Sequence, residues 1–382
     1  MARKIILAVA GSGKTYRICH GLNPVKKNLI LAFTHENVHN INRELASLPN
    51  GFPPLTDVMT FDSFVYRFCV LPFLPSIVEY FKYTDRMPCG VSLNEPPERS
   101  IGKRDQNGDV FYVPNKLYHK DTSLLHYIDS MRRFYCATLC ELVLKTGKGK
   151  NKLMRKVCDN INRCYHMVLI DEFQDFRLQE FDFLLEFAKR LKSVILVGDY
   201  YQHSVSGMNN SGKPYMVKKS EIGYDGFIRL LKDKKFEVET QELNASRRCG
   251  EGVCDFVYKK LGIAMFSQGV HQGVVKAVCD DDVDGVLSDT TIVKLVWENA
   301  AGQSFKPCVN WSYSKGDTYS SVCVILTNET RKLMDEDFHI PPDCAVRRNK
   351  LYVALTRSTG DVYVMRPEQI KAWNARNEKS VV

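Results

Sequence analysis

A short glycine-containing loop near the N-terminus constrains the fold of this chain more than any other feature. The loop reads Ala8-Val-Ala-Gly-Ser-Gly-Lys-Thr15; an apolar run that begins at Lys4 leads into it, and a helical pattern follows it. Small residues in such a loop let backbone N–H groups surround an anion at a helix N-terminus. We therefore predict a nucleotide-phosphate site with Lys14 on the β- and γ-phosphates and the Thr15 hydroxyl on Mg²⁺. The loop residues of this site are Gly11, Ser12, Gly13, Lys14 and Thr15.

Two further strand ends carry polar residues suited to nucleotide hydrolysis. The apolar run Met167–Ile170 ends in two adjacent carboxylates, Asp171 and Glu172. Beside a phosphate loop, we predict that Asp171 binds Mg²⁺ and that Glu172 polarises the attacking water as a general base. Gln202 follows the run Ser193–Val197 and can sense a γ-phosphate by hydrogen bonding. Together these residues predict Mg²⁺-dependent hydrolysis of a nucleoside triphosphate.

Two arginines far along the chain are candidates for the same reaction. Arg248 lies in the segment Leu243–Cys249, and Arg357 lies in Asn349–Ser358. An arginine supplied from a second domain stabilises the charge of a phosphoryl-transfer transition state by roughly 10³–10⁵ in rate. Single arginines are usually surface residues, so these two acquire a catalytic meaning only from the rest of the pattern.

The chain alternates strand-like and helix-like segments. The predicted strands are apolar without alternation, as expected for strands that are covered on both faces. They are Lys4–Ala10, Asn28–Phe33, Met167–Ile170, Ser193–Val197, Ser321–Leu326 and Asp361–Met365. Helical patterns such as Asn37–Leu48 and Gln179–Leu191 lie between them. This alternation predicts an α/β fold with doubly wound parallel sheets.

Loop-forming residues divide the chain into two predicted domains. The first covers residues 1–205 and contains an insert at about 71–156, which is rich in basic and aromatic residues. A Gly/Ser/Asn-rich stretch at Ser206–Gly212 is a plausible linker. The second domain covers residues 206–382, and we expect an irregular, reduced insert at about 266–307.

Composition limits the partners and the compartment. The chain has 53 Lys and Arg against 44 Asp and Glu, a net charge of +9 that is compatible with a nucleic-acid partner. Its 13 cysteines include no Cys-x₂-Cys pair, so we expect reduced thiols and a cytoplasmic protein. The N-terminal apolar run is too short for the usual signal peptide, and we find no run of about 18 apolar residues. We therefore expect no membrane partner.

The order of the motifs is more informative than any one of them. The phosphate loop, the Asp171–Asp175 segment, Val197–Gln202 and Leu351–Ser358 are the specific elements. Weaker elements stand in the matching order between them, at Phe33–Asn37, Thr60–Phe64, Leu243–Cys249 and Ser314–Tyr319. This order resembles the UvrD/Rep-like superfamily 1 helicases over nearly the whole chain.

The resemblance implies two RecA-like domains with ATP and Mg²⁺ in the cleft between them. Arg248 and Arg357 would then reach across from the second domain as catalytic residues. It further implies movement along single-stranded DNA, typically 3′ to 5′. The residues expected to contact the strand are Phe33, Thr34, Thr60, Phe64 and Lys315.

The chain departs from this family on the nucleoside side and on the strand side. Arg247 stands where a tyrosine normally stacks on the base, and a guanidinium can also stack on a purine. The glutamate expected near the ribose is Thr318, and the usual histidine positions for strand contact are Asp62 and Ser312. The glutamine element that normally precedes the phosphate loop is not found, and the large second-domain insert is reduced.

We interpret the chain as an ATP-dependent translocase or helicase on single-stranded DNA, with DNA favoured over RNA. The alternative is an ATP-gated module that regulates a partner protein, such as a nuclease, without productive unwinding. The reduced strand contacts favour that alternative, whereas the hydrolysis residues are compatible with both.

Overall fold

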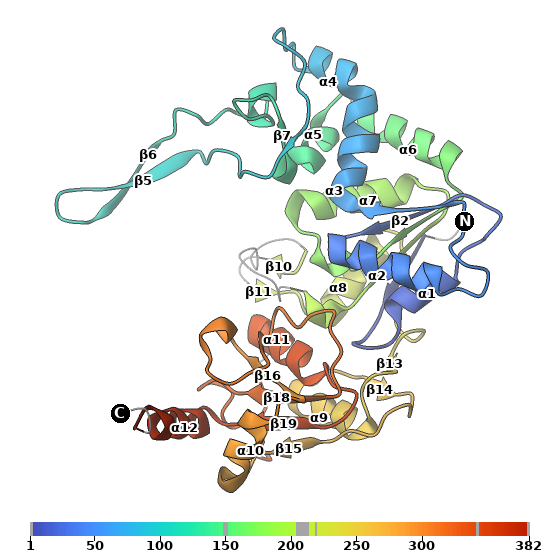
Figure 1. The fold of residues 1–382 in the computed structure, drawn as a ribbon. Helices are drawn as coiled ribbons and strands as arrows, with labels where there is room; N and C mark the ends of the chain where they lie inside the picture. Colours follow the sequence, from blue (N-terminus) through green and yellow to red (C-terminus); the bar gives the residue numbers. More distant parts are fainter. Residues whose placement is uncertain (1–2, 148–151, 204–213, 218–219, 341–343, 380–382) are drawn as a thin grey trace. The chain divides into compact units, whose positions relative to one another are not determined.

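The structure is a computed structural model that describes residues 3–147, 152–203, 214–217, 220–340 and 344–379 (Figure 1). The chain divides into two compact units. The first consists mainly of Cys19–Asp171 and Phe176–Ile195, and the second of Lys4–Ile18, Glu172–Asp175 and Leu196–Val382. The expected linker at Ser206–Gly212 lies outside the described residues, so the domain boundary after residue 205 stays a prediction.

The first sheet has six strands in the order β12-β1-β9-β8-β2-β3. The pairs β1–β12, β2–β3 and β2–β8 are parallel. Strands β2 and β9 are buried along their whole length, which explains their continuous apolar sequences. The strands are β1 (Arg3–Leu7), β2 (Asn28–Ala32), β3 (Thr56–Thr60), β8 (Met167–Ile170), β9 (Val194–Gly198) and β12 (Glu237–Glu239). The more polar strands β3 and β12 were not predicted.

Helices that pack through aromatic side chains accompany this sheet. The ring of Phe61 lies 5.6 Å from that of Phe183, and the ring of Phe64 lies 5.2 Å from that of Phe187. Thr34 caps α2 by accepting a hydrogen bond from the Asn37 N–H, so this helix starts two residues before the predicted one. The helices are α1 (Lys14–His20), α2 (His35–Ala46), α3 (Phe61–Phe64), α4 (Leu74–Tyr80), α5 (Leu139–Lys145), α6 (Lys152–Cys164) and α7 (Leu178–Arg190).

One helical stretch tests the expectation of no membrane span. Between α3 and α4 the chain forms a π-helical turn at Val65–Val70 and a 3₁₀ turn at Leu71–Phe73, so Phe61–Tyr80 is continuously helical. By length and composition alone it could cross a membrane, contrary to what the sequence suggested. A core helix passes the same test, and Phe61 and Phe64 pack as core residues. The expectation of no membrane partner therefore stays a prediction.

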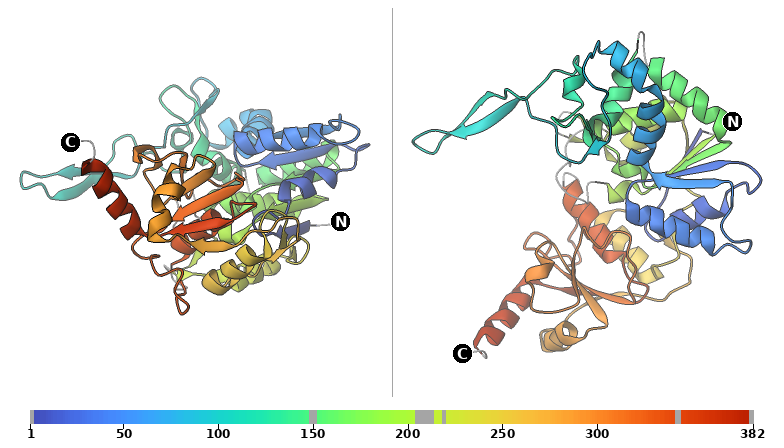
Figure 2. Two further views of the ribbon diagram at one scale, coloured as in Figure 1. Left: turned by 60° about the horizontal axis from the view of Figure 1, so that its bottom comes forward. Right: turned by 45° about the horizontal axis from the view of Figure 1, so that its top comes forward.

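The predicted insert at 71–156 contains small sheets of its own. Strands β4 (Val91–Ser92) and β7 (Phe134–Tyr135) pair in parallel, and β5 (Ser100–Arg104) and β6 (Val110–Pro114) form an antiparallel hairpin. Figures 1 and 2 show this hairpin extending away from the helices of its unit. Its side chains are mostly exposed, with Tyr112 at 72%. Residues 148–151 of this insert lie outside the described residues.

The second sheet has five parallel strands in the order β15-β19-β18-β16-β17. They are β15 (Val275–Ala277), β16 (Ile292–Val296), β17 (Cys308–Asn310), β18 (Ser321–Ile325) and β19 (Val362–Met365). Two of them, β15 and β16, come from the stretch at 266–307 that we expected to be irregular, so that expectation is wrong there. With three and five residues, β15 and β16 are too short to show a clear hydrophobic periodicity in the sequence.

Period-two alternation in the central strand β18 explains the layers of this unit. Val322 and Val324 face a core formed with α9 (Glu251–Leu261) and α11 (Ala345–Leu355). Cys323 and Ile325 face a second core formed with α10 (Val283–Ser288), with α12 (Pro367–Lys379) packed against it. Successive side chains of a strand point to opposite faces, so a fully apolar strand needs helices on both sides. The remaining elements are α8 (Gly223–Asp233), β10 (Met216–Val217), β11 (Ser220–Glu221), β13 (Ala245–Ser246) and β14 (Phe266–Ser267).

Candidate nucleotide-hydrolysis site

The phosphate loop connects β1 to α1, as the sequence predicts. Gly11 and Gly13 have φ values of +71° and +89°, which side chains rarely adopt. A Cβ on Gly11 would also lie 2.6 Å from Ser246 Oγ and 2.7 Å from Arg248 Cβ. Ser12 Oγ is buried and has no hydrogen-bond partner among the described residues. A buried hydroxyl without a partner is costly, so this loop fits an added acceptor such as a phosphate.

Glu172 lies between two lysines. Its two carboxylate oxygens are 3.6 Å from Lys14 Nζ and 3.7 Å from Lys315 Nζ. Burial alone would raise the pKa of Glu172, but the charges of Lys14 and Lys315 outweigh it and lower the pKa. Glu172 also has φ +52°, an unusual backbone conformation for a residue with a side chain. Glu172 is therefore ionised, as a group that orients a water molecule must be.

Lys315 lies elsewhere than the sequence suggested. Its Nζ donates a 2.6 Å hydrogen bond to Asp175 Oδ2, and its side chain is largely buried. The carboxylates of Asp175 and Glu172 outweigh burial and raise the pKa of Lys315. The charge of Lys315 thus pairs with these acidic residues, and its expected role in contacting a nucleic-acid strand stays a prediction.

Asp199 organises the segment that contains Gln202. Asp199 Oδ2 accepts hydrogen bonds from Gln202 Nε2 at 2.9 Å and from the Tyr352 hydroxyl at 3.1 Å. Burial raises the pKa of Asp199 to about 6, against the lowering effects of Lys14 and Tyr352. The Tyr352 hydroxyl also accepts the Ala10 N–H at 2.7 Å. One tyrosine therefore connects the phosphate loop, the β9 end and helix α11.

The predicted arginines lie side by side without carboxylate ion pairs among the described residues. Arg357 is 1% exposed, and its guanidinium donates to backbone carbonyls of Val353, Ser314 and Asp317. Arg248 donates to the Thr356 carbonyl at 3.1 Å. Burial, and then the charge of Arg357, lower the pKa of Arg248. One buried guanidinium (Arg357) beside one half-buried guanidinium (Arg248) favours an anionic ligand, since an anion would offset their repulsion.

Arg247 lies on the exposed side of the loop, next to a residue that the sequence analysis missed. Its guanidinium lies 4.7 Å from the centre of the Tyr16 ring, and its Nε donates to Gln268 Oε1 at 3.2 Å. Tyr16 is 44% exposed. A stacked arginine and tyrosine are suited to contact a planar base. The position of Tyr16 directly after Thr15 was the signal that could have identified it.

The strand-contact candidates after β2 and β3 differ in exposure. Phe33 is half-buried, with its ring edge-on to Phe176, and Thr34 is exposed. Thr60 is 7% exposed and caps α3. Phe64 is fully buried in the aromatic core, so it lacks the free face that stacking on a base requires. The ring of Phe64 fills the core in this structure, and its expected contact with a strand stays a prediction.

A second buried cluster follows Gln202. The His203 ring stacks on Tyr215 at 3.9 Å, and Glu221 pairs with Arg348 of α11 at 3.1 Å. Asn349 donates to the His203 carbonyl at 3.0 Å. His203 is therefore a core residue that ties the β9 end to α11.

The metal ligands predicted for Mg²⁺ are Thr15 and Asp171. Thr15 is half-buried at the start of α1, and Asp171 is 1% exposed directly after β8. Among the described residues, no cluster of three or more His, Cys, Asp or Glu side chains could hold a metal by itself. This donor set fits Mg²⁺, which is usually held by one or two protein oxygens together with phosphates and water.

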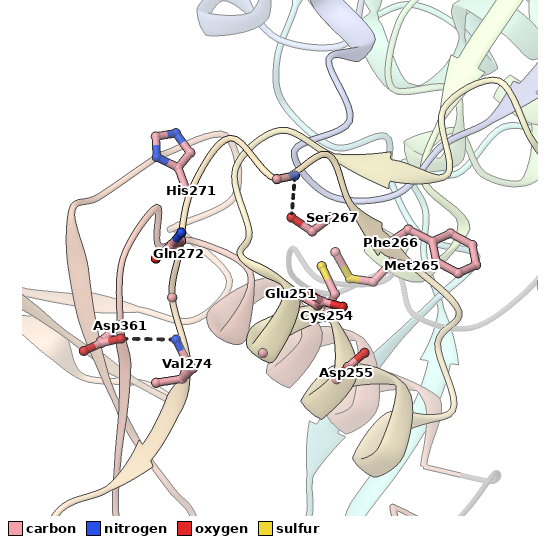
Figure 3. A pocket seen from close by; sticks show the side chains of 13 residues that line it. Glu251, Cys254, Asp255, Met265, Phe266, Ser267, His271, Gln272, Val274 and Asp361 are labelled. Carbon is pink, nitrogen blue, oxygen red and sulfur yellow. Dashed lines mark hydrogen bonds between the residues drawn. The ribbon is translucent and has the colours of Figure 1, made fainter.

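A pocket of about 580 Å³ lies away from these residues (Figure 3). It is formed by one side of α9 and the segment from Met265 to Val274, and none of the predicted nucleotide-site residues lines it. Figure 3 shows Asp361 bonded to the Val274 backbone at the edge of the pocket, a contact of 3.1 Å. The Asp361 carboxylate thus fixes the backbone at this edge of the pocket.

Two protein families match the chain, each over more than half of its length. Residues 2–208 match a family described as an AAA domain. Residues 120–366 match the viral superfamily 1 RNA helicase core domain. The chain belongs to the superfamily 1 helicases. The α/β fold with two parallel sheets agrees with the tandem RecA-like domains of a superfamily 1 helicase core.

Solved helicases resemble the chain at low identity. The arterivirus nonstructural protein 10 helicase is 12% identical with a TM-score of 0.45, over 95% of this chain and 59% of that one. The PRRSV helicase is 14% identical with a TM-score of 0.43, over 96% and 52%. A complex of the arterivirus nonstructural protein 10 helicase with DNA is 14% identical with a TM-score of 0.44, over 95% of this chain and 61% of that one. The chain spans only about half to three fifths of the length of those proteins. No curated protein matches the sequence.

Proposed function

We propose that this superfamily 1 helicase core hydrolyses ATP and uses it to move along single-stranded nucleic acid, in the 3′ to 5′ direction. One observation carries the proposal. The phosphate loop, Glu172, the buried Arg357 and the half-buried Arg248 all lie in the second compact unit. Neither arginine forms an ion pair with a carboxylate among the described residues. This arrangement supplies an anion site, a general base and transition-state cations together.

Each group has a distinct task in hydrolysis. The loop N–H groups and Lys14 bind the β- and γ-phosphates, and Glu172 orients the attacking water and accepts its proton. Arg248 and Arg357 stabilise the charge that develops on the transferred phosphoryl group. Thr15 and Asp171 would hold Mg²⁺, which neutralises phosphate charge when bound. The Gln202 amide donates a hydrogen bond to Asp199 in this structure. To contact a γ-phosphate, Gln202 must exchange that hydrogen bond for one to the phosphate.

The finer assignments are proposals as well. Motif order supports the UvrD/Rep-like branch and DNA as the strand. The matched core family is described for viral RNA helicases, which makes RNA the second candidate strand. All thirteen cysteines are described and free, which supports the cytoplasm as the compartment.

A second candidate function has its own support. Phe64 is buried and Lys315 is paired with acidic residues, so two of the five expected strand contacts are engaged inside the protein. This favours a nucleotide-gated module that controls a partner protein, such as a nuclease. Hydrolysis would then proceed without coupling to a strand.

Steady-state ATP hydrolysis distinguishes these functions. We would measure the rate alone, with single-stranded DNA, and with RNA of the same sequence, at two salt concentrations. Stimulation that weakens with salt identifies a strand-coupled motor, because phosphate contacts release counterions. The Glu172→Gln variant should lose roughly 10²-fold or more in kcat and still bind nucleotide. A wild-type rate that neither strand changes supports the regulatory module, and a wild type without hydrolysis refutes both.

A further inference from the structure

The histidine that follows Gln202 is enclosed by side chains from three other segments of its unit. Only 2% of the His203 side chain is exposed. One face of its ring stacks on Tyr215, with the ring centres 3.9 Å apart and the planes within 2° of parallel. Asn349 Nδ2 lies 3.4 Å and 3.5 Å from the two ring nitrogens, so the amide lies against the ring rather than in line with the lone pair of either nitrogen. The groups at the edge of the ring therefore decide its protonation.

Both nitrogens at that edge face oxygen atoms. The Nδ1 atom of His203 bonds to the Tyr200 carbonyl oxygen, which can only accept, and Nε2 lies 3.5 Å from Glu221 Oε1. A neutral imidazole has one N–H group, so one of its nitrogens would direct a lone pair at an oxygen. The imidazolium has two N–H groups and suits both oxygens. The geometry therefore fits the protonated form of His203.

Glu221 of β11 is shared between His203 and helix α11. Its carboxylate accepts hydrogen bonds from Arg348 of α11 at 3.1 Å and from the Tyr200 hydroxyl at 2.7 Å. Burial and then the charge of Glu221 raise the pKa of Tyr200, so this hydroxyl stays a neutral donor. Burial of the ring and the charge of Arg348 oppose a proton on His203, whereas the facing carboxylate and carbonyl favour it. Because Glu221 contacts both cations, it offsets their repulsion.

These contacts lie next to the segment that carries Gln202. On one side of Gln202, Asp199 accepts hydrogen bonds from the Gln202 amide and from the Tyr352 hydroxyl of α11. On the other side, Asn349 Nδ2 of α11 donates to the His203 carbonyl at 3.0 Å. The segment is thus attached to α11 at both ends. A shift of His203 would therefore move Gln202 relative to this helix.

We propose that His203 is a positioning residue for ATP hydrolysis and acts as an imidazolium, which pairs with Glu221 and holds the Gln202 segment against α11. Loss of its proton removes the pairing, loosens the segment and lowers the rate. This inference rests on the proposed function, because it assigns a residue to the hydrolysis that we propose. His203 acts through Gln202 and through Arg357, which follows the end of α11, rather than on the phosphates themselves.

NMR reads the charge of His203 directly. The chain has nine histidines, and the side-chain signal that His203→Gln removes from a ¹³C/¹⁵N spectrum belongs to His203. We expect this ring to be mostly protonated at about pH 7.5, where an ordinary histidine is about nine-tenths neutral. Glu221→Gln keeps an acceptor for Arg348 and Tyr200 but removes the charge. It should lower the pH of half-protonation by about 1.

An exposed pair of the same residue types is the matched control. His20 Nε2 lies 3.0 Å from Glu44 Oε1, and the two side chains are 30% and 33% exposed. Water and salt screen such a pair, so Glu44→Gln should change the half-protonation of His20 by less than about 0.5 in pH. A larger shift in the buried pair shows that burial and geometry, rather than a nearby carboxylate alone, hold the proton of His203.

The pH profile of hydrolysis tests the positioning role. We would measure kcat for strand-free ATP hydrolysis between about pH 6 and 9. In the wild type, kcat should fall about tenfold as His203 loses its proton. In Glu221→Gln the fall should begin at the lower pH that NMR gives for that variant, and His203→Gln should have a low kcat without this fall. His20→Gln should retain the wild-type profile. A purely structural role would not make the rate follow the titration of one ring.

The outcomes separate this inference from the proposed function. A His203 ring that is neutral at about pH 7.5 would overturn the imidazolium. A protonated ring with the same pH profile of kcat in wild type and His203→Gln would overturn the positioning role and leave the hydrolysis site intact. If His203→Gln does not fold, Glu221→Gln supplies the same comparison. A wild type that hydrolyses no ATP would refute the proposed function, and the positioning role with it.

Discussion

Removing one buried hydroxyl should destabilise the second unit measurably. The Tyr352 side chain is fully buried, donates to Asp199 at 3.1 Å and accepts the Ala10 N–H at 2.7 Å. Tyr352→Phe keeps the ring and creates almost no cavity, so the effect isolates these two hydrogen bonds. No second partner of the Ala10 N–H is described, and Ala10 is fully buried.

The magnitude follows from these contacts. An orphaned buried N–H costs about 1–3 kcal/mol, and a lost hydrogen bond to a charged group costs about 1.5–3 kcal/mol. Because neighbouring effects are not additive, we expect a total of about 2–5 kcal/mol. That is a large share of the roughly 5–15 kcal/mol by which a protein is stable.

Urea unfolding followed by tryptophan fluorescence is the suitable assay. All three tryptophans, Trp297, Trp311 and Trp373, lie in the second unit, so the signal reports the unit that contains Tyr352. The midpoint should fall by about 1–2 M at an unchanged slope of about 1–3 kcal/mol per molar. Tyr258→Phe, whose side chain is exposed, is the control and should shift it by less than about 0.2 M. A Tyr352→Phe midpoint within about 0.2 M urea of the wild-type midpoint would refute the reasoning.

Two further predictions concern charged groups of the same site. Lys315→Met should lower the rate of strand-free ATP hydrolysis at least about tenfold, while the affinity for a strand changes less than about twofold. The reason is that the Lys315 ammonium pairs with the carboxylates of Glu172 and Asp175. Unchanged hydrolysis with weakened strand binding would return Lys315 to its expected role in strand contact. Burial raises the pKa of Asp199 to about 6 from an unfolded value near 3.8, so the folded state binds its proton more tightly. The unfolding free energy should therefore fall by up to about 3 kcal/mol from this group as pH rises from about 4 to 6, a slope that Asp199→Asn should remove.

Local signals were sufficient for the phosphate site. Gly11 and Gly13 need left-handed backbone, Lys14 starts a helix, and β8 ends next to Asp171 and Glu172, all within a few residues. Such features are encoded by neighbours in the chain, so a single sequence reveals them. The second sheet was harder to predict, because β15 and β17 have only three residues each and carry little periodicity.

Side-chain partners from distant segments could not be predicted in the same way. Phe33 and Phe64 look equivalent in the sequence, each in one of the weaker motif elements, Phe33–Asn37 and Thr60–Phe64. Only the packing of Phe64 against Phe187 shows that it belongs to the core. Lys315 looks like an exposed cation until Asp175, far away in the sequence, is found 2.6 Å from its nitrogen. The neighbours of a charge, rather than its identity, decide its role.

The sequence by itself determined the class of the protein, the α/β fold and the residues of the phosphate loop. Those properties depend on backbone conformation, on apolar runs and on the order of motifs, which are all properties of local sequence. Tertiary structure alone decided which tyrosine bridges Ala10 and Asp199, which cations share Glu172, and which aromatic rings remain exposed. Each of these is a contact between segments far apart in the chain, and its energy depends on distance and burial that no local pattern encodes.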